Sequence, residues 1–105
     1  MKEEYENIAL IKNDAENKFQ MTVDGHTAFI LFKERENIIS LIHTESPDEL
    51  AGRGVATAII EKTLQYLDEN NYTLVPLCPL VYAYIKRHLD WTKIVRDDFK
   101  EKLQS

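Results

Sequence analysis

The sequence has a single cysteine, only three glycines and only three prolines among its 105 residues. One cysteine excludes an internal disulfide and is typical of a reducing compartment, so we expect a cytoplasmic protein. The scarcity of glycine and proline, with a hydrophobic content of 44%, argues against disorder and predicts a packed fold. The length predicts a single domain over residues 1–105.

Long hydrophobic runs and an excess of positive charge are also absent. No apolar run approaches the roughly 20 residues of a membrane span, and the N-terminus lacks a signal-peptide pattern, so we expect no membrane association. The formal net charge of −5 argues against nucleic acid as a partner, because phosphate-backbone binding needs a basic surface. An acidic surface can attract amines, although it also serves plain solubility. We expect no bound metal.

The apolar pattern predicts strands and helices in a definite order. Strand-like runs lie at residues 8–11, 18–23, 27–32, 38–43 and 73–77. Asp24-Gly25 predicts a hairpin turn and residues 34–37 a second one, so the first four strands form an antiparallel meander. Helical periodicity predicts helices at about residues 56–70, 79–88 and 96–102.

The most informative stretch is the loop Gly52-Arg53-Gly54, which joins the fourth strand to the first long helix. Strand, loop, helix and strand form a crossover unit that places the fifth strand parallel to the fourth. The loop then lies at the carboxyl end of a strand and at a helix N-terminus, whose unpaired N–H groups attract phosphate. The alternative is a tight turn without a ligand. A P-loop ending and a G-x-G-x-x-G fingerprint are both absent.

Residues 51–56, Ala-Gly-Arg-Gly-Val-Ala, resemble the acetyl-CoA loop of the GCN5-related N-acetyltransferase superfamily, whose pattern is Gln/Arg-x-x-Gly-x-Gly/Ala. Ala51 departs from the pattern, because the family usually has Gln or Arg there. The chain is also similar to the small, single-domain YjdJ-like subfamily from about residue 24 to residue 91. The motifs that carry this second likeness are His43-Thr44-Glu45, Gly52-Arg53-Gly54, Pro76-Leu77-Cys78-Pro79, Tyr84-Ile85 and His88.

This resemblance implies an α/β (α+β) fold with an acetyltransferase-type mixed sheet, an antiparallel meander followed by the β-loop-α-β crossover. It would be a minimal version that lacks the family's N-terminal helices, because only residues 13–17 connect the first two strands. The resemblance also implies acetyl-CoA (coenzyme A) as cofactor. The pantetheine arm would pair along Leu41, Ile42 and His43, and the pyrophosphate would bind at Gly52, Arg53, Gly54, Val55, Ala56 and Thr57.

Four residues are candidates for catalysis. Cys78 precedes a predicted helix start and is a possible acyl acceptor, although a lone cysteine is more often a small buried hydrophobe. Glu45 can act as a general base, and His43 is either a second base or a hydrogen-bonded core residue. Tyr84 matches a tyrosine with which family members protonate the departing thiolate. Tyr82 is the alternative.

We therefore expect a protein that binds acetyl-CoA and transfers the acetyl group to a small-molecule or protein amine, acting as a monomer or weak dimer. An acyl-CoA-binding module or sensor without turnover is the alternative. It is favoured by the missing helices, which would leave the acceptor site open. In a third interpretation the chain is an interaction domain and the glycine loop is only a turn.

Overall fold

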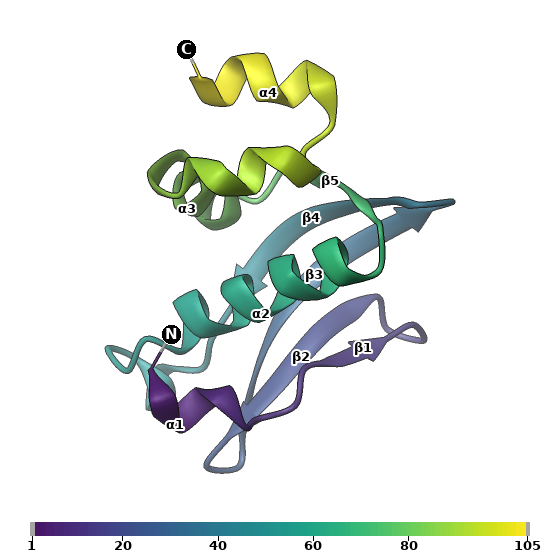
Figure 1. Ribbon diagram of the computed structural model, residues 1–105. Helices are drawn as coiled ribbons and strands as arrows, with labels where there is room; N and C mark the ends of the chain where they lie inside the picture. The colour runs from purple at the N-terminus through teal and green to yellow at the C-terminus, as the bar shows by residue number, and fades with distance from the viewer. Residues whose placement is uncertain (1, 105) are drawn as a thin grey trace.

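A computed structural model of the chain describes residues 2–104 (Figure 1). The helices are α1 (Glu3–Glu6), α2 (Val55–Glu69), α3 (Pro79–Arg87) and α4 (Asp97–Gln104), with 3-10 segments η1 (Asp48–Leu50) and η2 (Leu89–Ile94). The strands are β1 (Ile11–Asn13), β2 (Lys18–Val23), β3 (His26–Arg35), β4 (Ile38–Glu45) and β5 (Thr73–Pro76). No helix within residues 2–104 is long and apolar enough to cross a membrane.

The five strands form one mixed sheet in the order β1-β2-β3-β4-β5. The first four strands pair antiparallel and β5 pairs parallel to β4, which confirms the predicted meander and crossover. The prediction for the first strand was wrong, because β1 covers residues 11–13 and not 8–11. The short turn into β2 forces the residues directly before it to pair, whereas Ile8 and Leu10 pack against the core from outside the sheet.

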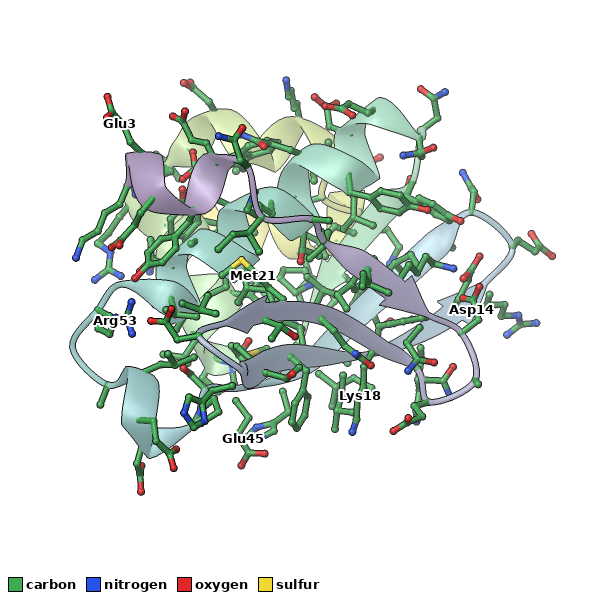
Figure 2. The ribbon with its side chains drawn as sticks, turned by 90° about the horizontal axis from the view of Figure 1, so that it is seen from below. Glu3, Asp14, Lys18, Met21, Glu45 and Arg53 are labelled. Atoms are coloured by element: carbon green, nitrogen blue, oxygen red, sulfur yellow. The ribbon has the colours of Figure 1, made fainter. Side chains whose placement is uncertain are left out.

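Helix α2 packs against one face of the sheet and leaves the other face of β2 and β3 open. Along β2, and along β3 as far as Phe32, every second residue is buried on the α2 side, as the pleat requires. Figure 2 shows α1 and α2 on one side of the sheet, with Lys18 and Glu45 pointing away from them on the other. Helix α3 contacts β4 and β5, and α4 packs on α3 (Figure 1).

Strand β4 contains a β-bulge. Phe32 of β3 pairs with Leu41, whereas its neighbour Leu31 pairs with His43, so Ile42 is an additional residue on β4. A bulge of this kind reverses which residues face the core. Leu41 is buried before it and Thr44 after it, while His43 is exposed.

Candidate functional site

The glycine loop turns the chain sharply between η1 and α2. Both Gly52 (φ 75°) and Gly54 (φ 77°) adopt left-handed backbone angles, which glycine reaches without the steric penalty of a Cβ. Leu50 and Val55, each 1% exposed, anchor the two ends of the loop in the core. The loop is therefore held in one geometry at the carboxyl end of β4.

This loop presents backbone N–H groups that have no acceptor. The first helical bond of α2 runs from the Ala58 N–H to the Gly54 carbonyl (3.0 Å), and no side chain caps the helix. Within residues 2–104, the N–H groups of residues 54–57 consequently lack a hydrogen-bond partner. The first turn of α2 also carries no acidic side chain. Four free donors at the positive end of a 15-residue helix fit the diphosphate of coenzyme A.

The N-terminal segment braces the loop, a feature that the sequence analysis missed. The buried Tyr5 donates a hydrogen bond from its hydroxyl to the Arg53 carbonyl (2.7 Å). The Lys2 Cε atom lies 3.5 Å from the position that a Cβ on Gly54 would take. The Arg53 guanidinium pairs with Asp24 at the β2–β3 turn (2.8 Å). Aromatic and acidic residues near the N-terminus carry no periodic signal that could have revealed these contacts.

Strands β4 and β5 separate beyond the pair Leu41 and Pro76, while β4 runs on to Glu45. The Cys78 N–H donates to the Leu41 carbonyl (2.8 Å) at the point of separation. From Ile42 to Glu45, the edge of β4 that faces β5 makes no strand-pairing hydrogen bond with β5. A strand-like arm such as pantetheine fits an edge of this kind.

Cys78 lies at the point where β4 and β5 separate, and its side chain is 1% exposed. Its Sγ atom is 3.2 Å from the Oγ1 atom of Thr44, which is also buried. Cys78 comes directly before α3, which begins with Pro79 as the sequence predicted. The thiol therefore faces the continuation of β4 but has almost no contact with solvent.

His43 and Glu45 share the open face of the sheet. They pair with Leu31 and Phe29 of β3, and directly opposed residues lie on the same face. The His43 Nε2 and Glu45 Oε1 atoms are 3.8 Å apart, and the two side chains are 55% and 60% exposed. The pair thus stands beside the separation of β4 and β5, accessible to an incoming molecule.

Tyr84 lies in a different environment from the other candidates. It is 7% exposed, and its ring packs against His88 with 4.3 Å between ring centroids. Burial raises the pKa of Tyr84, and the negative charge of Glu61 on α2 raises it further. Tyr82, the alternative, is half-buried and lies under the Lys86 ammonium. The structure therefore groups His43 with Glu45, and Cys78 with Thr44, while Tyr84 faces toward α2.

The match to a family model decides the classification. Residues 18–94 match the model of the GCN5-related N-acetyl-transferase family. The chain belongs to this family. The matched region of the family member runs from the first residue of β2 to the last residue of η2 and contains the whole glycine loop.

The fold of this family member is also found among solved structures. It is similar to the NMR solution structure of a GCN5-like candidate N-acetyltransferase from Staphylococcus aureus, with a TM-score of 0.63 and 23% sequence identity. The alignment covers 87% of this chain and 90% of the other. No curated protein sequence matches the chain. Within residues 2–104, no group of three or more His, Cys, Asp or Glu side chains is placed to hold a metal ion.

Proposed function

We propose that the protein binds acetyl-CoA and transfers its acetyl group to an amine. The observation that carries this proposal is the row of free N–H groups at residues 54–57, beside the separation of β4 and β5. The N–H groups of the loop bind the diphosphate, with Thr57 as a side-chain helper. Arg53, which is held by Asp24, orients the loop. The exposed edge of β4 at Ile42 and His43 pairs with the pantetheine arm, leading the thioester toward Glu45.

Catalysis on this surface would rest mainly on positioning, because the thioester of acetyl-CoA supplies the activated acyl group. A backbone N–H on the free edge of β4 polarises the thioester carbonyl as the amine attacks. Glu45, with His43 beside it, takes the proton that the attacking amine nitrogen loses. Tyr84 then protonates the departing sulfur, because a tyrosine phenol carries its proton at neutral pH.

Transfer through Cys78 is a second route. In that route the thiolate accepts the acetyl group as a thioester and the amine then attacks it. The contact with Thr44 places the sulfur beside β4, but the 1% exposure leaves little access for an amine. Direct transfer therefore fits this geometry better.

An acyl-CoA-binding module without turnover is the second candidate function. The observation that favours it is the open face of the sheet, where the His43 and Glu45 side chains are 55% and 60% exposed and, within residues 2–104, no helix encloses an acceptor. Figure 2 shows Glu45 pointing away from α1 and α2. Release of free thiol from acetyl-CoA in the presence of a panel of amines tests the choice. Acceptor-dependent release supports the transferase, whereas tight binding without release from any amine supports the module.

A further inference from the structure

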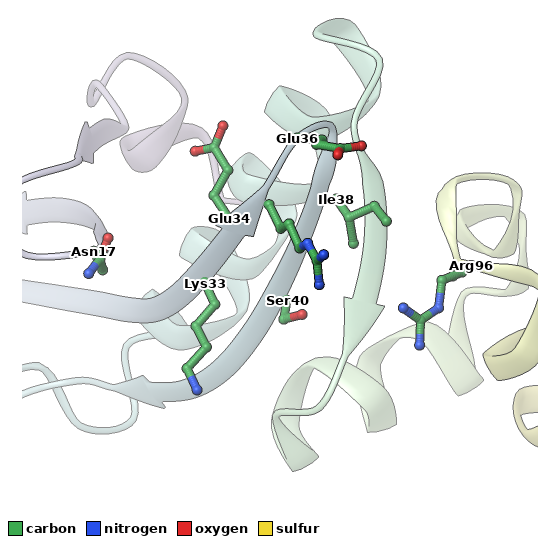
Figure 3. A pocket seen from close by; sticks show the side chains of 8 residues that line it. Asn17, Lys33, Glu34, Glu36, Ile38, Ser40 and Arg96 are labelled. Carbon is green, nitrogen blue, oxygen red and sulfur yellow. The ribbon is translucent and has the colours of Figure 1, made fainter.

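The open face of the sheet holds a second feature, toward the end of β4 that is opposite the His43–Glu45 pair. A hollow of about 720 Å³ lies over the β3–β4 hairpin, away from the glycine loop (Figure 3). Its volume falls in the range of small-ligand sites, roughly 300–1,000 Å³. The hollow is lined by Asn17, Lys33, Glu34, Arg35, Glu36, Ile38, Ser40 and Arg96.

Two cations in this hollow are uncompensated. Within residues 2–104, neither Lys33 nor Arg35 has a hydrogen bond or an ion pair. Arg96 is different, because Asp98 holds it through two hydrogen bonds of 2.7 and 2.9 Å. Lys33 and Arg35 therefore present free positive charge on a chain whose formal net charge is −5.

The acidic residues of the hollow do not neutralise this pair. The Glu34 carboxylate binds the Lys12 ammonium (2.6 Å) and accepts a hydrogen bond from the Tyr72 hydroxyl (3.1 Å). Figure 3 shows Glu34 and Lys33 pointing to opposite sides of the hairpin. Of the acidic residues that line the hollow, only Glu36, at the tip of the hairpin, is left to offset the charge of Lys33 and Arg35.

Strand pairing places these cations in line with the exposed base. Lys33 pairs with Ser40 of β4, and Arg35 pairs with Ile38. Across the bulge, Lys33 and the partner of Glu45, Phe29, are four residues apart on β3, which corresponds to about 13 Å of strand. An extended peptide covers that span with about four residues. An amine at His43 and Glu45 could thus carry its anionic group at Lys33 and Arg35.

We propose that the acceptor amine belongs to an acidic peptide, whose carboxylate binds Lys33 and Arg35 while its amine reaches Glu45. This inference rests on the proposed transferase function, and it adds the chemical class of the acceptor. The spacing favours a peptide over a small amino acid, whose amine and carboxylate lie too close together to reach both ends of the face.

The test compares two short peptides that differ only at the fourth residue, Asp in one and Asn in the other, each with a free N-terminal amine. We expect kcat/KM for thiol release from acetyl-CoA to be about fivefold higher for the Asp peptide, as for a pair of exposed ion pairs, and to lose this advantage at high salt. The double substitution Lys33→Gln with Arg35→Gln should abolish the preference. The single substitution Lys33→Gln should weaken the preference, whereas its single-charge control Lys86→Gln, at an exposed position of α3, should keep it.

A second measurement separates this inference from the transferase function. Binding of the labelled Asp peptide to the full chain without acetyl-CoA is followed by fluorescence anisotropy, in the wild type and the double variant. Thiol release that is equal for both peptides overturns the acidic acceptor and leaves the transferase intact. Charge-dependent peptide binding with no thiol release from any amine keeps the anion site and overturns the transferase. Absence of both overturns both.

Discussion

At the scale of single residues, the contact between Cys78 and Thr44 bears on the choice between direct and relayed transfer. A sulfur that is 1% exposed and 3.2 Å from a buried hydroxyl is packed as a core residue is packed. We therefore expect no acetyl adduct on the intact protein after incubation with acetyl-CoA, measured by mass spectrometry. Cys78→Ala should keep substantial transferase activity.

The relay would give the opposite pattern for the same variants. One added acetyl mass in the wild type, lost in Cys78→Ala together with activity, would establish the relay. Cys78→Ser should then be nearly as damaging, because a hydroxyl is a far weaker nucleophile than a thiolate at neutral pH. Thermal unfolding of each variant shows whether a loss of activity reflects a loss of fold.

Glu45 and Tyr84 are predicted to act on opposite sides of the pH profile. A general base must be deprotonated, so Glu45→Gln should lower kcat by about 100-fold and remove the acidic limb. A general acid must be protonated, so Tyr84→Phe should alter the alkaline limb, which the raised pKa of Tyr84 places above pH 10. Glu69→Gln, at the exposed end of α2, is a control for the lost charge. A Glu45→Gln profile that matches the Glu69→Gln profile would remove Glu45 from the mechanism.

The positions of His43 and Glu45 show what residue-level reasoning could not supply. Strict alternation along β4 would place both on the buried side with Ile39 and Leu41. The extra residue at Ile42 reverses this, and His43 and Glu45 point outward. A bulge is set by the pairing partner, and the sequence of one strand does not reveal it.

At the scale of elements, the glycine loop and the first turn of α2 form the proposed diphosphate site. Gly54→Val places a branched side chain on a left-handed residue, at a strain of about 1–2 kcal/mol. It also obstructs the approach of a diphosphate to the free N–H groups. We expect affinity for coenzyme A, measured by calorimetry, to fall at least about tenfold, roughly 1.4 kcal/mol.

A matched control separates strain from obstruction. Asn71 also has a left-handed backbone (φ 60°), and it lies just past the end of α2 that is opposite the loop. Asn71→Val should therefore destabilise the protein by a similar amount, measured by thermal unfolding, without a comparable loss of affinity. Equal losses of affinity in the two variants would mean that Gly54 acts only through the fold.

The elements themselves were largely predictable. The period of the apolar residues gave the bounds of α2 and α3 within about two residues, because one face of each helix is buried. Helix α1 was not predicted, since four residues with one buried side chain, Tyr5, leave no periodic signal. The brace from Tyr5 to Arg53 spans 48 positions, and no local pattern encodes a contact of that range.

At the scale of the whole molecule, three tyrosines link stability to pH: Tyr5 and Tyr84, which are buried, and Tyr72, which is half-buried. Burial is the main cause of the raised pKa values of Tyr5, Tyr72 and Tyr84. A raised pKa means that the folded state keeps the phenol proton up to a higher pH than the unfolded chain does. The protonated phenols therefore contribute to the free energy of unfolding. This contribution is fully present below the ordinary tyrosine pKa of about 10, and it is lost as the pH rises through the pKa values of the folded state.

Urea unfolding between pH 8 and pH 11 measures this effect. We expect the free energy of unfolding to be nearly constant up to about pH 9 and to fall above pH 10. In Tyr84→Phe the fall should be smaller, because one of the three linked groups is gone. A free energy of unfolding that rises above pH 10 would contradict the burial of these phenols.

The arrangement of the sheet was predictable because hairpin turns and a crossover dictate it, whereas the use of its two faces was not. The sequence indicated a chain without the usual N-terminal helices, and the structure shows the result as an open face beside the glycine loop (Figure 2). The hollow over the β3–β4 hairpin depends on pairing between distant residues and on Arg96, from the far end of the chain. Local sequence patterns reveal neither the pairing of distant residues nor the position of Arg96.

The central claim is that the free N–H groups of residues 54–57 bind the diphosphate of coenzyme A. Isothermal titration calorimetry with coenzyme A, dephospho-coenzyme A and pantetheine tests it most directly. We expect only modestly weaker binding of dephospho-coenzyme A and far weaker binding of pantetheine, which lacks the diphosphate. Equal affinity for coenzyme A and pantetheine, or no binding of coenzyme A at all, would contradict it.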